Sequence, residues 1–219
     1  MNIAIFGASG MVGQGVLREC LLDPNVTSVL SIGRSLTGKS HPKLREILRA
    51  NFLDLTPLEP QLSGIDACLF CLGVSSSGMT EEEYTRVTYG FTIAAAQTLA
   101  RLNPQLTFVY LSGAGADSSE HGRVMWARVR GRTENALFRL PMKAAYAFRP
   151  AAIVPLHGAR SRTRLYRLLY TVTGPLLPLL HAIFPKYVTT TEKLARAMLQ
   201  VARNGAPKQV LESADIAAL

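Results

Sequence analysis

Short apolar runs and amphipathic stretches alternate along the 219 residues of this chain. Runs that are nearly all apolar, such as residues 2–6, are typical of strands buried on both faces of a parallel sheet. Helical spacing of apolar residues predicts the intervening helices. We expect strands at 2–6, 28–32, 47–51, 67–72, 107–111 and 145–148, and helices at 11–22, 80–102, 124–140 and 191–203. This alternation predicts an α/β fold with a doubly wound parallel sheet of six or seven strands.

Local signals mark the ends of these helices. Thr80, followed three residues later by Glu83, forms a capping-box pattern, and Asn103-Pro104 ends the helix that it begins. Gly205 stands just past the last predicted helix, where a glycine C-cap is common.

The length fits one α/β domain, so we predict a single domain over residues 1–219, with about 156–190 as a cap or interface segment within it. The apolar stretch 165–184 is almost long enough to cross a bilayer. An arginine, a histidine, a Gly-Pro pair and a further proline interrupt it. A flap over a substrate pocket or an interface of a homodimer is therefore our expectation, and peripheral membrane contact is an alternative.

The positive charge is concentrated in one segment. The chain has a net charge of +9, and residues 123–167 hold ten arginines and one lysine against the single acid Glu134. This segment is either a solvated surface or a surface that faces an anion, such as cofactor phosphates, an acidic substrate or a membrane. Because no nucleic-acid-binding module is recognisable, the charge does not favour a nucleic acid partner.

The cysteines indicate neither a disulfide framework nor a metal site. Three are present, and Cys68-x-x-Cys71 lies inside an apolar run without a second pair of ligands. We expect buried thiols there and no bound metal. The odd number of cysteines, together with the absence of a signal-peptide pattern at residues 1–6, predicts a cytoplasmic location.

Three glycines follow the first predicted strand. In Gly7-Ala8-Ser9-Gly10-Met11-Val12-Gly13, the first glycine allows a tight turn, the second lets the backbone approach a pyrophosphate, and the third lets the helix pack closely on the sheet. The helix that begins here offers free N–H groups to phosphates. A glycine triplet between a buried strand and a helix predicts a dinucleotide-binding site.

Arg34, at the end of the second predicted strand, suggests which dinucleotide binds. A site specific for NAD places an acid here to bind the ribose 2′-hydroxyl, whereas arginine suits a 2′-phosphate. The predicted cofactor is therefore NADP(H).

Over about residues 1–155 the chain resembles the short-chain dehydrogenase/reductase family. The resemblance rests on the motifs above and on residues at the ends of later strands: Asp54, Cys71-Leu72-Gly73, Ser112 and Arg149-Pro150. The glycine spacing and the loop 112–117 resemble the atypical members related to the Tat-interacting-protein reductases. The resemblance implies that Ser112 faces the nicotinamide. It also implies a set of cofactor-binding residues: Gly7, Ser9, Gly10, Met11, Val12 and Gly13 at the pyrophosphate, Arg34 at the 2′-phosphate, Phe52, Leu53 and Asp54 near the adenine, Leu72 and Gly73 beneath the cofactor, and Arg130, Arg149 and Pro150.

The chain departs from the family at the Tyr-x-x-x-Lys pair, whose place is held by Trp126 and Arg130. An indole N–H donates a hydrogen bond but is no general acid, whereas Arg130 can still bind ribose hydroxyls. Tyr84, Tyr89 and His121 are the candidate substitutes for the lost acid. For each, packing or simple exposure is the ordinary alternative.

Three functions remain open at this point. The first is an NADPH-dependent oxidoreductase that acts on a small carbonyl or enone, with Ser112 polarising the substrate. The second is a non-catalytic NADPH-binding or redox-sensing protein, in which Trp126 covers the nicotinamide. The third is an epimerase or isomerase that acts on an anionic nucleotide-linked substrate.

Overall fold

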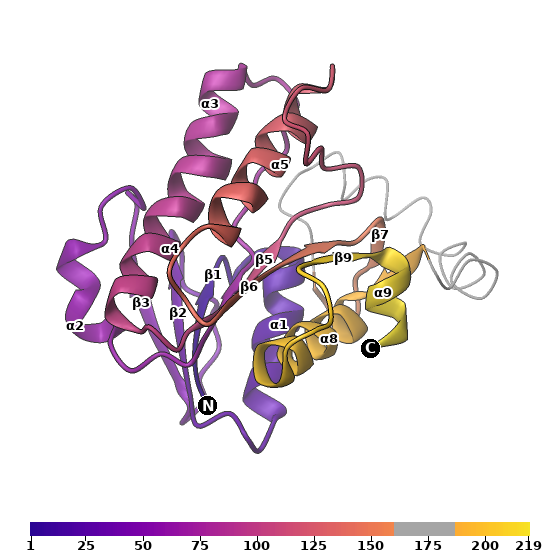
Figure 1. Ribbon diagram of the computed structural model, residues 1–219. Helices are drawn as coiled ribbons and strands as arrows, with labels where there is room; N and C mark the ends of the chain where they lie inside the picture. The colour runs from indigo at the N-terminus through magenta and orange to yellow at the C-terminus, as the bar shows by residue number, and fades with distance from the viewer. Residues whose placement is uncertain (160–186) are drawn as a thin grey trace.

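The computed structural model describes residues 1–159 and 187–219 of the chain. A central sheet is covered by helices on both faces (Figure 1), and its strands all run parallel in the order β3-β2-β1-β4-β5-β6-β9. The strands of this sheet are β1 Asn2–Phe6, β2 Ser28–Gly33, β3 Leu44–Leu48, β4 Ala67–Phe70, β5 Thr107–Leu111, β6 Ala144–Arg149 and β9 Val210–Glu212. A second, two-stranded parallel sheet pairs β7 Ala152–Val154 with β8 Val188–Thr190. The doubly wound parallel sheet predicted from the sequence is confirmed.

The helical segments alternate with these strands. They are α1 Met11–Leu22, the 3₁₀ turn η1 Thr56–Leu58, α2 Glu59–Leu62, α3 Glu81–Thr85, the π-helical turn η2 Arg86–Gly90, α4 Phe91–Leu102, α5 Met125–Phe138, α8 Thr191–Asn204 and α9 Ser213–Ala218. Thr80 and Glu83 form the predicted capping box at the start of α3, and Gly205 ends α8 with a φ of 75°. In the part of the chain that the structure describes, no helix is long and apolar enough to cross a membrane.

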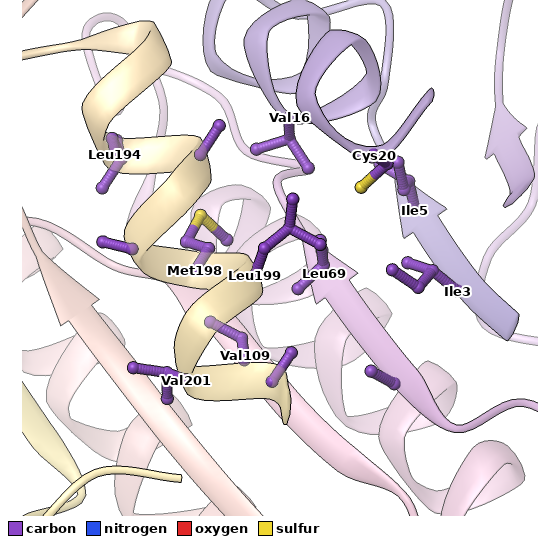
Figure 2. Packing of buried hydrophobic residues seen from close by; sticks show 14 of the residues in the cluster. Ile3, Ile5, Val16, Cys20, Leu69, Val109, Leu194, Met198, Leu199 and Val201 are labelled. Atoms are coloured by element: carbon purple, nitrogen blue, oxygen red, sulfur yellow. The ribbon is translucent and has the colours of Figure 1, made fainter. Parts of the chain in front are cut away.

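Each central strand contributes to two hydrophobic cores, because successive side chains point to opposite faces of the sheet. Ile3 and Ile5 pack with Leu69, Val109 and residues of α1 and α8 on one face (Figure 2). Ala4 and Phe6 pack on the other face with Phe70, Phe108 and residues of α4. Burial of both faces is the reason that these strands are apolar throughout.

The structure corrects two of the element predictions. The third strand spans Leu44–Leu48 rather than 47–51, since at the sheet edge β3 pairs with β2 alone and carries the charged Arg45 and Glu46. The helix predicted over 80–102 is interrupted by the π-helical turn Arg86–Gly90.

The residues after 187 belong largely to the main fold rather than to a cap. Helix α8 lies along α1 in one core, and β9 extends the main sheet beside β6. Most of the predicted cap at 156–190, including the apolar stretch 165–184, falls within 160–186 and lies outside the described residues.

Candidate functional site

The glycine turn lies at the carboxyl ends of β1 and β4, where the order of the strands reverses and α/β sheets bind their ligands. Gly7 has a φ of 83°, which favours glycine, and a Cβ there would lie 2.7 Å from the backbone of Leu72. A Cβ on Gly13 would lie 2.1 Å from the carbonyl oxygen of Gly7. Both positions therefore require glycine, as the dinucleotide motif predicts.

The N-terminus of α1 fits a pyrophosphate. Gly10 is the N-cap residue in an extended conformation, and no side chain in the described part of the chain caps this helix. The N–H groups of the first turn of α1 remain available to an anion, and the helix dipole favours negative charge at this end. The residues present thus fit the phosphates of a dinucleotide.

Arg34 lies just past the end of β2 with an exposed side chain, and no hydrogen bond or ion pair joins it to the described residues. Ser35, beside it, donates a hydrogen bond from its hydroxyl to Ser9 Oγ over 3.3 Å. Ser9 in turn lines a cavity of about 700 Å³ together with Lys39 and His41. Arg34 and Lys39 place two cations near the glycine turn.

The residues predicted near the adenine separate into two groups. Phe52 is completely buried and packs on Phe6 and Phe91, so its side chain belongs to the core and not to a ligand site. Leu53 is exposed, and Asp54 forms an ion pair with Arg49. The side chain of Phe52 is thus a core residue, and its predicted position near the adenine stays a prediction for its backbone alone.

A cavity of about 600 Å³ opens beside the glycine turn. It joins residues from six separate places in the sequence, which the parallel topology brings to the same edge of the sheet. The residues that line it are Gly10, Met11, Val12, Cys71, Gly73, Val74, Ser75, Ser76, Tyr84, Leu111, Ser112, Gly113, Ala114, Trp126, Arg130, Pro150, Ala151 and Ile153.

Tyr84 and Arg130 contact each other in this cavity. Tyr84, on α3, is 1% exposed, and its hydroxyl accepts a hydrogen bond from Arg130 Nε, on α5, over 3.0 Å. Burial alone would lower the pKa of Arg130, but Tyr110, Tyr84 and Glu134 outweigh it and raise that pKa. The guanidinium therefore stays charged beside the phenol.

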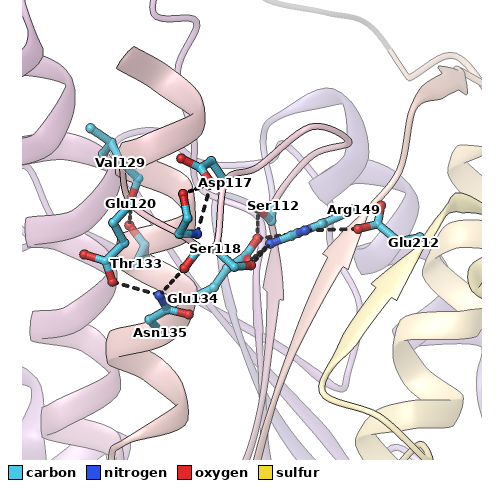
Figure 3. A network of polar contacts seen from close by, with 11 residues as sticks. Ser112, Asp117, Ser118, Glu120, Val129, Thr133, Glu134, Asn135, Arg149 and Glu212 are labelled. Atoms are coloured by element: carbon cyan, nitrogen blue, oxygen red, sulfur yellow. Dashed lines mark hydrogen bonds and ion pairs between the residues drawn. The ribbon is translucent and has the colours of Figure 1, made fainter. Parts of the chain in front are cut away.

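Ser112 is held by a buried network (Figure 3). Its hydroxyl donates to the carboxylate of Glu134, which is fully buried on α5. The guanidinium of Arg149 also donates to both oxygens of Glu134, and it binds Glu212 Oε1 over 3.0 Å. Arg149, predicted at the cofactor, thus binds two carboxylates and is absent from the lining of the cavity, whereas its neighbour Pro150 lines it.

The remaining candidate acids lie elsewhere. Tyr89 stands on the π-helical turn with Arg132 over its ring, 4.6 Å from the centroid, and is not among the residues that line the cavity. His121 is exposed in the loop before α5 and is also absent from that lining. Of the three candidate substitutes, the structure brings only Tyr84 to Ser112, Trp126 and Arg130 in the described part of the chain.

Several arginines of the basic segment have partners within the protein. Arg128 binds Glu81 on α3 over 2.7 Å, while Arg130, Arg132 and Arg149 have the contacts given above. The later arginines of the segment, from 160 onward, lie outside the described residues. Much of the described positive charge is therefore used to join α3, α5 and β6.

Cys68 is buried within β4, and Cys71 follows that strand and lines the cavity. Burial raises the pKa of both thiols, to about 12 for Cys71. Among the residues that the structure describes, no group of His, Cys, Asp and Glu could hold a metal ion. These thiols are therefore weakly reactive groups in an apolar environment.

Reasoning from the sequence missed Glu134, Ser75 and Ser76. Glu134 is the only acid within 123–167, and it stands four residues after Arg130 on the same helix. This isolation among arginines is a signal of a paired, buried carboxylate. Ser75 and Ser76 follow β4 in a loop and carry no comparable signal.

The parallel sheet, the glycine turn at its switch point and the adjoining cavity define a Rossmann domain of the dinucleotide-binding class. No protein-family model matches the chain. The chain is 26% identical to the rat protein HTATIP2 over 155 residues, which are 70% of this chain and 63% of HTATIP2. It is 24% identical to the mitochondrial protein fmp52-2 of Neosartorya fischeri over 226 residues, 99% of this chain and 94% of that protein.

Solved structures share the fold. A short-chain dehydrogenase family protein from Francisella tularensis superposes with a TM-score of 0.71 at 14% identity, over 96% of this chain and 95% of that one. The Bordetella bronchiseptica enzyme WbmF in complex with NAD⁺ gives a TM-score of 0.70 at 16% identity, over 99% and 76%. With the sequence relatives, these structures confirm the resemblance to atypical short-chain dehydrogenases/reductases. The aligned region of HTATIP2 is less than two thirds of that protein.

Proposed function

We propose that this chain is an NADP(H)-dependent oxidoreductase that reduces a small carbonyl compound, with Tyr84 as the proton donor. One observation carries the proposal: the Tyr84 hydroxyl lies in the cavity beside the glycine turn and accepts a hydrogen bond from Arg130. The contact places a tyrosine next to a permanent cation. The family pairs a tyrosine with a lysine at the places that Trp126 and Arg130 hold here, so Tyr84 replaces the missing tyrosine beside Arg130.

The cofactor site is supported by the geometry of the glycine turn. Gly7, Gly10 and Gly13 leave room for a pyrophosphate on the first turn of α1, and Arg34 is available to a 2′-phosphate. Bound NADPH supplies a hydride to the substrate carbon. The complex of WbmF with NAD⁺ supports a nicotinamide dinucleotide for this fold, and Arg34 favours the phosphorylated form.

Tyr84 completes the reduction by donating its phenolic proton to the substrate oxygen as the carbon gains the hydride. Because the Tyr84 hydroxyl oxygen accepts from Arg130, its own O–H is directed away from the guanidinium, and none of the described residues accepts a hydrogen bond from it. The adjacent positive charge stabilises the phenolate that remains. Solvent then supplies the proton that restores the Tyr84 phenol.

The walls of the cavity are largely apolar and do not favour a cationic substrate. Trp126, Met11, Val74 and Ile153 supply apolar surface, while no carboxylate is among the described lining residues. The Trp126 ring lies against Gly115, where a Cβ would be 3.3 Å from the indole. Trp126 thus supplies a large apolar surface to the cavity.

The experiment compares Tyr84→Phe with Tyr89→Phe in NADPH oxidation across a panel of aldehydes, ketones and quinones. Tyr89 lies five residues along the same helical run and contacts Arg132 outside the cavity, so it is a matched control. General acid catalysis contributes about 10²–10⁴-fold, so Tyr84→Phe should lose about this factor in kcat with NADPH affinity unchanged. Tyr89→Phe should behave as the native protein.

Two results would contradict the proposal. Native turnover that survives Tyr84→Phe would exclude Tyr84 as the proton donor. Tight NADPH binding without turnover of any compound would favour the non-catalytic binder, which the presence of Trp126 at the family's tyrosine position also suggests.

A further inference from the structure

The network around Ser112 fixes the direction of its only O–H bond. Arg149, whose guanidinium is always charged and is purely a donor, donates to both carboxylate oxygens of Glu134, so Glu134 faces Ser112 as an acceptor. The hydrogen bond between Ser112 and Glu134 must therefore use the serine proton. Both side chains are buried, Glu134 completely, so water does not compete for this contact.

The consequence is a reversal of the role expected of Ser112. The sequence predicts that this serine polarises a substrate carbonyl, which requires it to donate its proton. With that proton held by Glu134, the serine oxygen presents only lone pairs to the cavity that it lines. Tyr84, by contrast, has its oxygen engaged by Arg130 and its O–H available. The cavity thus presents one donor, Tyr84 on α3, and one acceptor, Ser112 just after β5.

We propose that Ser112 is a hydrogen-bond acceptor for the ligand and that Glu134 is the positioning residue that makes it one. The site then selects compounds that carry a hydroxyl group, and in the reductive direction these are hydroxy-carbonyl compounds whose carbonyl oxygen meets Tyr84 while the hydroxyl donates to Ser112. This substrate class rests on the function proposed above, but the acceptor role of Ser112 is a property of the cavity alone.

Trp126 allows a direct test without turnover. It is the only tryptophan of the chain and lines the same cavity, so its fluorescence reports on ligands there. The probes are cyclohexanol and its methyl ether, which differ in the presence of a donor proton. One neutral hydrogen bond corresponds to about two- to tenfold in affinity. The native protein should bind the alcohol more tightly than the ether by about this factor, and Ser112→Ala should abolish the difference.

Glu134→Gln adds a reversal. Oε1 of Glu134 accepts from both Ser112 and Arg149 Nε, whereas Oε2 accepts from Arg149 Nη2. With the glutamine oxygen kept on Arg149 Nη2, the N–H₂ stands in place of Oε1 and no longer accepts the serine proton, which is released towards the cavity. The preference should then shift towards the ether, which is purely an acceptor. Glu212→Gln is the matched control, because it alters the other carboxylate on Arg149 and leaves the contact between Ser112 and Glu134 in place. Circular dichroism melting verifies that each variant is folded. If Glu134→Gln does not fold, the binding of the two probes to Ser112→Ala decides the test alone.

The proposal would be overturned if the native protein bound the two probes equally, bound the ether more tightly, or showed no fluorescence response to either. A preference for the alcohol that persists in Ser112→Ala would overturn it as well. A separate NADPH titration keeps the two proposals apart. Loss of NADPH binding with a retained alcohol preference would contradict the oxidoreductase function and leave the role of Ser112 intact.

Discussion

At the scale of single residues, the sequence predicts the positions that backbone geometry determines. Gly7 and Gly13 are required because a Cβ would collide with neighbouring backbone, and a glycine pattern reveals such constraints without any knowledge of the fold. The contacts of Tyr84 with Arg130 and of Ser112 with Glu134 could not be predicted in the same way. Their partners lie 46 and 22 residues apart in the chain, and the packing of α5 against its neighbours brings them together.

The predicted preference for NADP(H) over NAD(H) rests on Arg34. Charge-assisted hydrogen bonds to a 2′-phosphate are worth about 1.5–3 kcal/mol, or roughly 10- to 100-fold in affinity. Arg34→Ala should weaken NADPH binding by this factor and leave NADH binding almost unchanged, as measured by calorimetric titration. Lys39→Ala, at a neighbouring exposed cation, is the matched control and should have a smaller effect. Equal affinities of the native protein for the two cofactors would contradict the assignment.

At the scale of elements, strong local signals gave correct boundaries and weak ones did not. The capping box at Thr80 and the glycine after α8 place helix ends correctly because each satisfies backbone groups locally. Strand β3 was displaced because an edge strand with Arg45 and Glu46 lacks a continuous apolar pattern. The π-helical turn at Arg86–Gly90 has no signature in the sequence, since its extra residue per turn is stabilised by tertiary packing.

The capping box should contribute measurably to stability. Thr80 Oγ1 accepts from the backbone N–H of Glu83 over 3.2 Å, so Thr80→Ala leaves that donor without its partner. We expect a loss of about 1 kcal/mol in the free energy of unfolding, measured by urea denaturation. Thr98→Ala is the control, since that hydroxyl bonds back to Ala94 within the helix and its loss should be nearly neutral. A similar effect of both substitutions would contradict the role of the cap.

At the scale of the whole molecule, the residues after 187 complete the fold that holds the site. Helix α8 buries Leu194 and Met198 against the sheet beside α1, the helix whose N-terminus faces the glycine turn (Figure 2). The sequence predicts the helix at 191–203 but not β9, because the pairing of β9 with β6 joins residues more than 60 apart and no local pattern reveals it.

Met198→Ala tests this dependence on the core. Met198 is fully buried, so the substitution should cost about 2–5 kcal/mol in the free energy of unfolding. Arg203→Ala, on the same helix, removes an ion pair with Asp23 that is partly exposed to solvent and should cost about 1 kcal/mol or less. Chemical denaturation of both variants measures the difference, and comparable losses would show that α8 contributes little to the core.

The central claim is that a reduced nicotinamide dinucleotide binds in the cavity beside the glycine turn, and energy transfer from Trp126 tests it most directly. Trp126 is the only tryptophan and lines that cavity, so its emission should excite a bound dihydronicotinamide ring. Titration with NADPH should quench Trp126 and produce sensitised nicotinamide emission, both saturating together. Gly13→Val, which places a side chain against the backbone of Gly7, should abolish both signals. Trp126 emission that shows no saturable response to NADPH in the folded native protein would contradict the account.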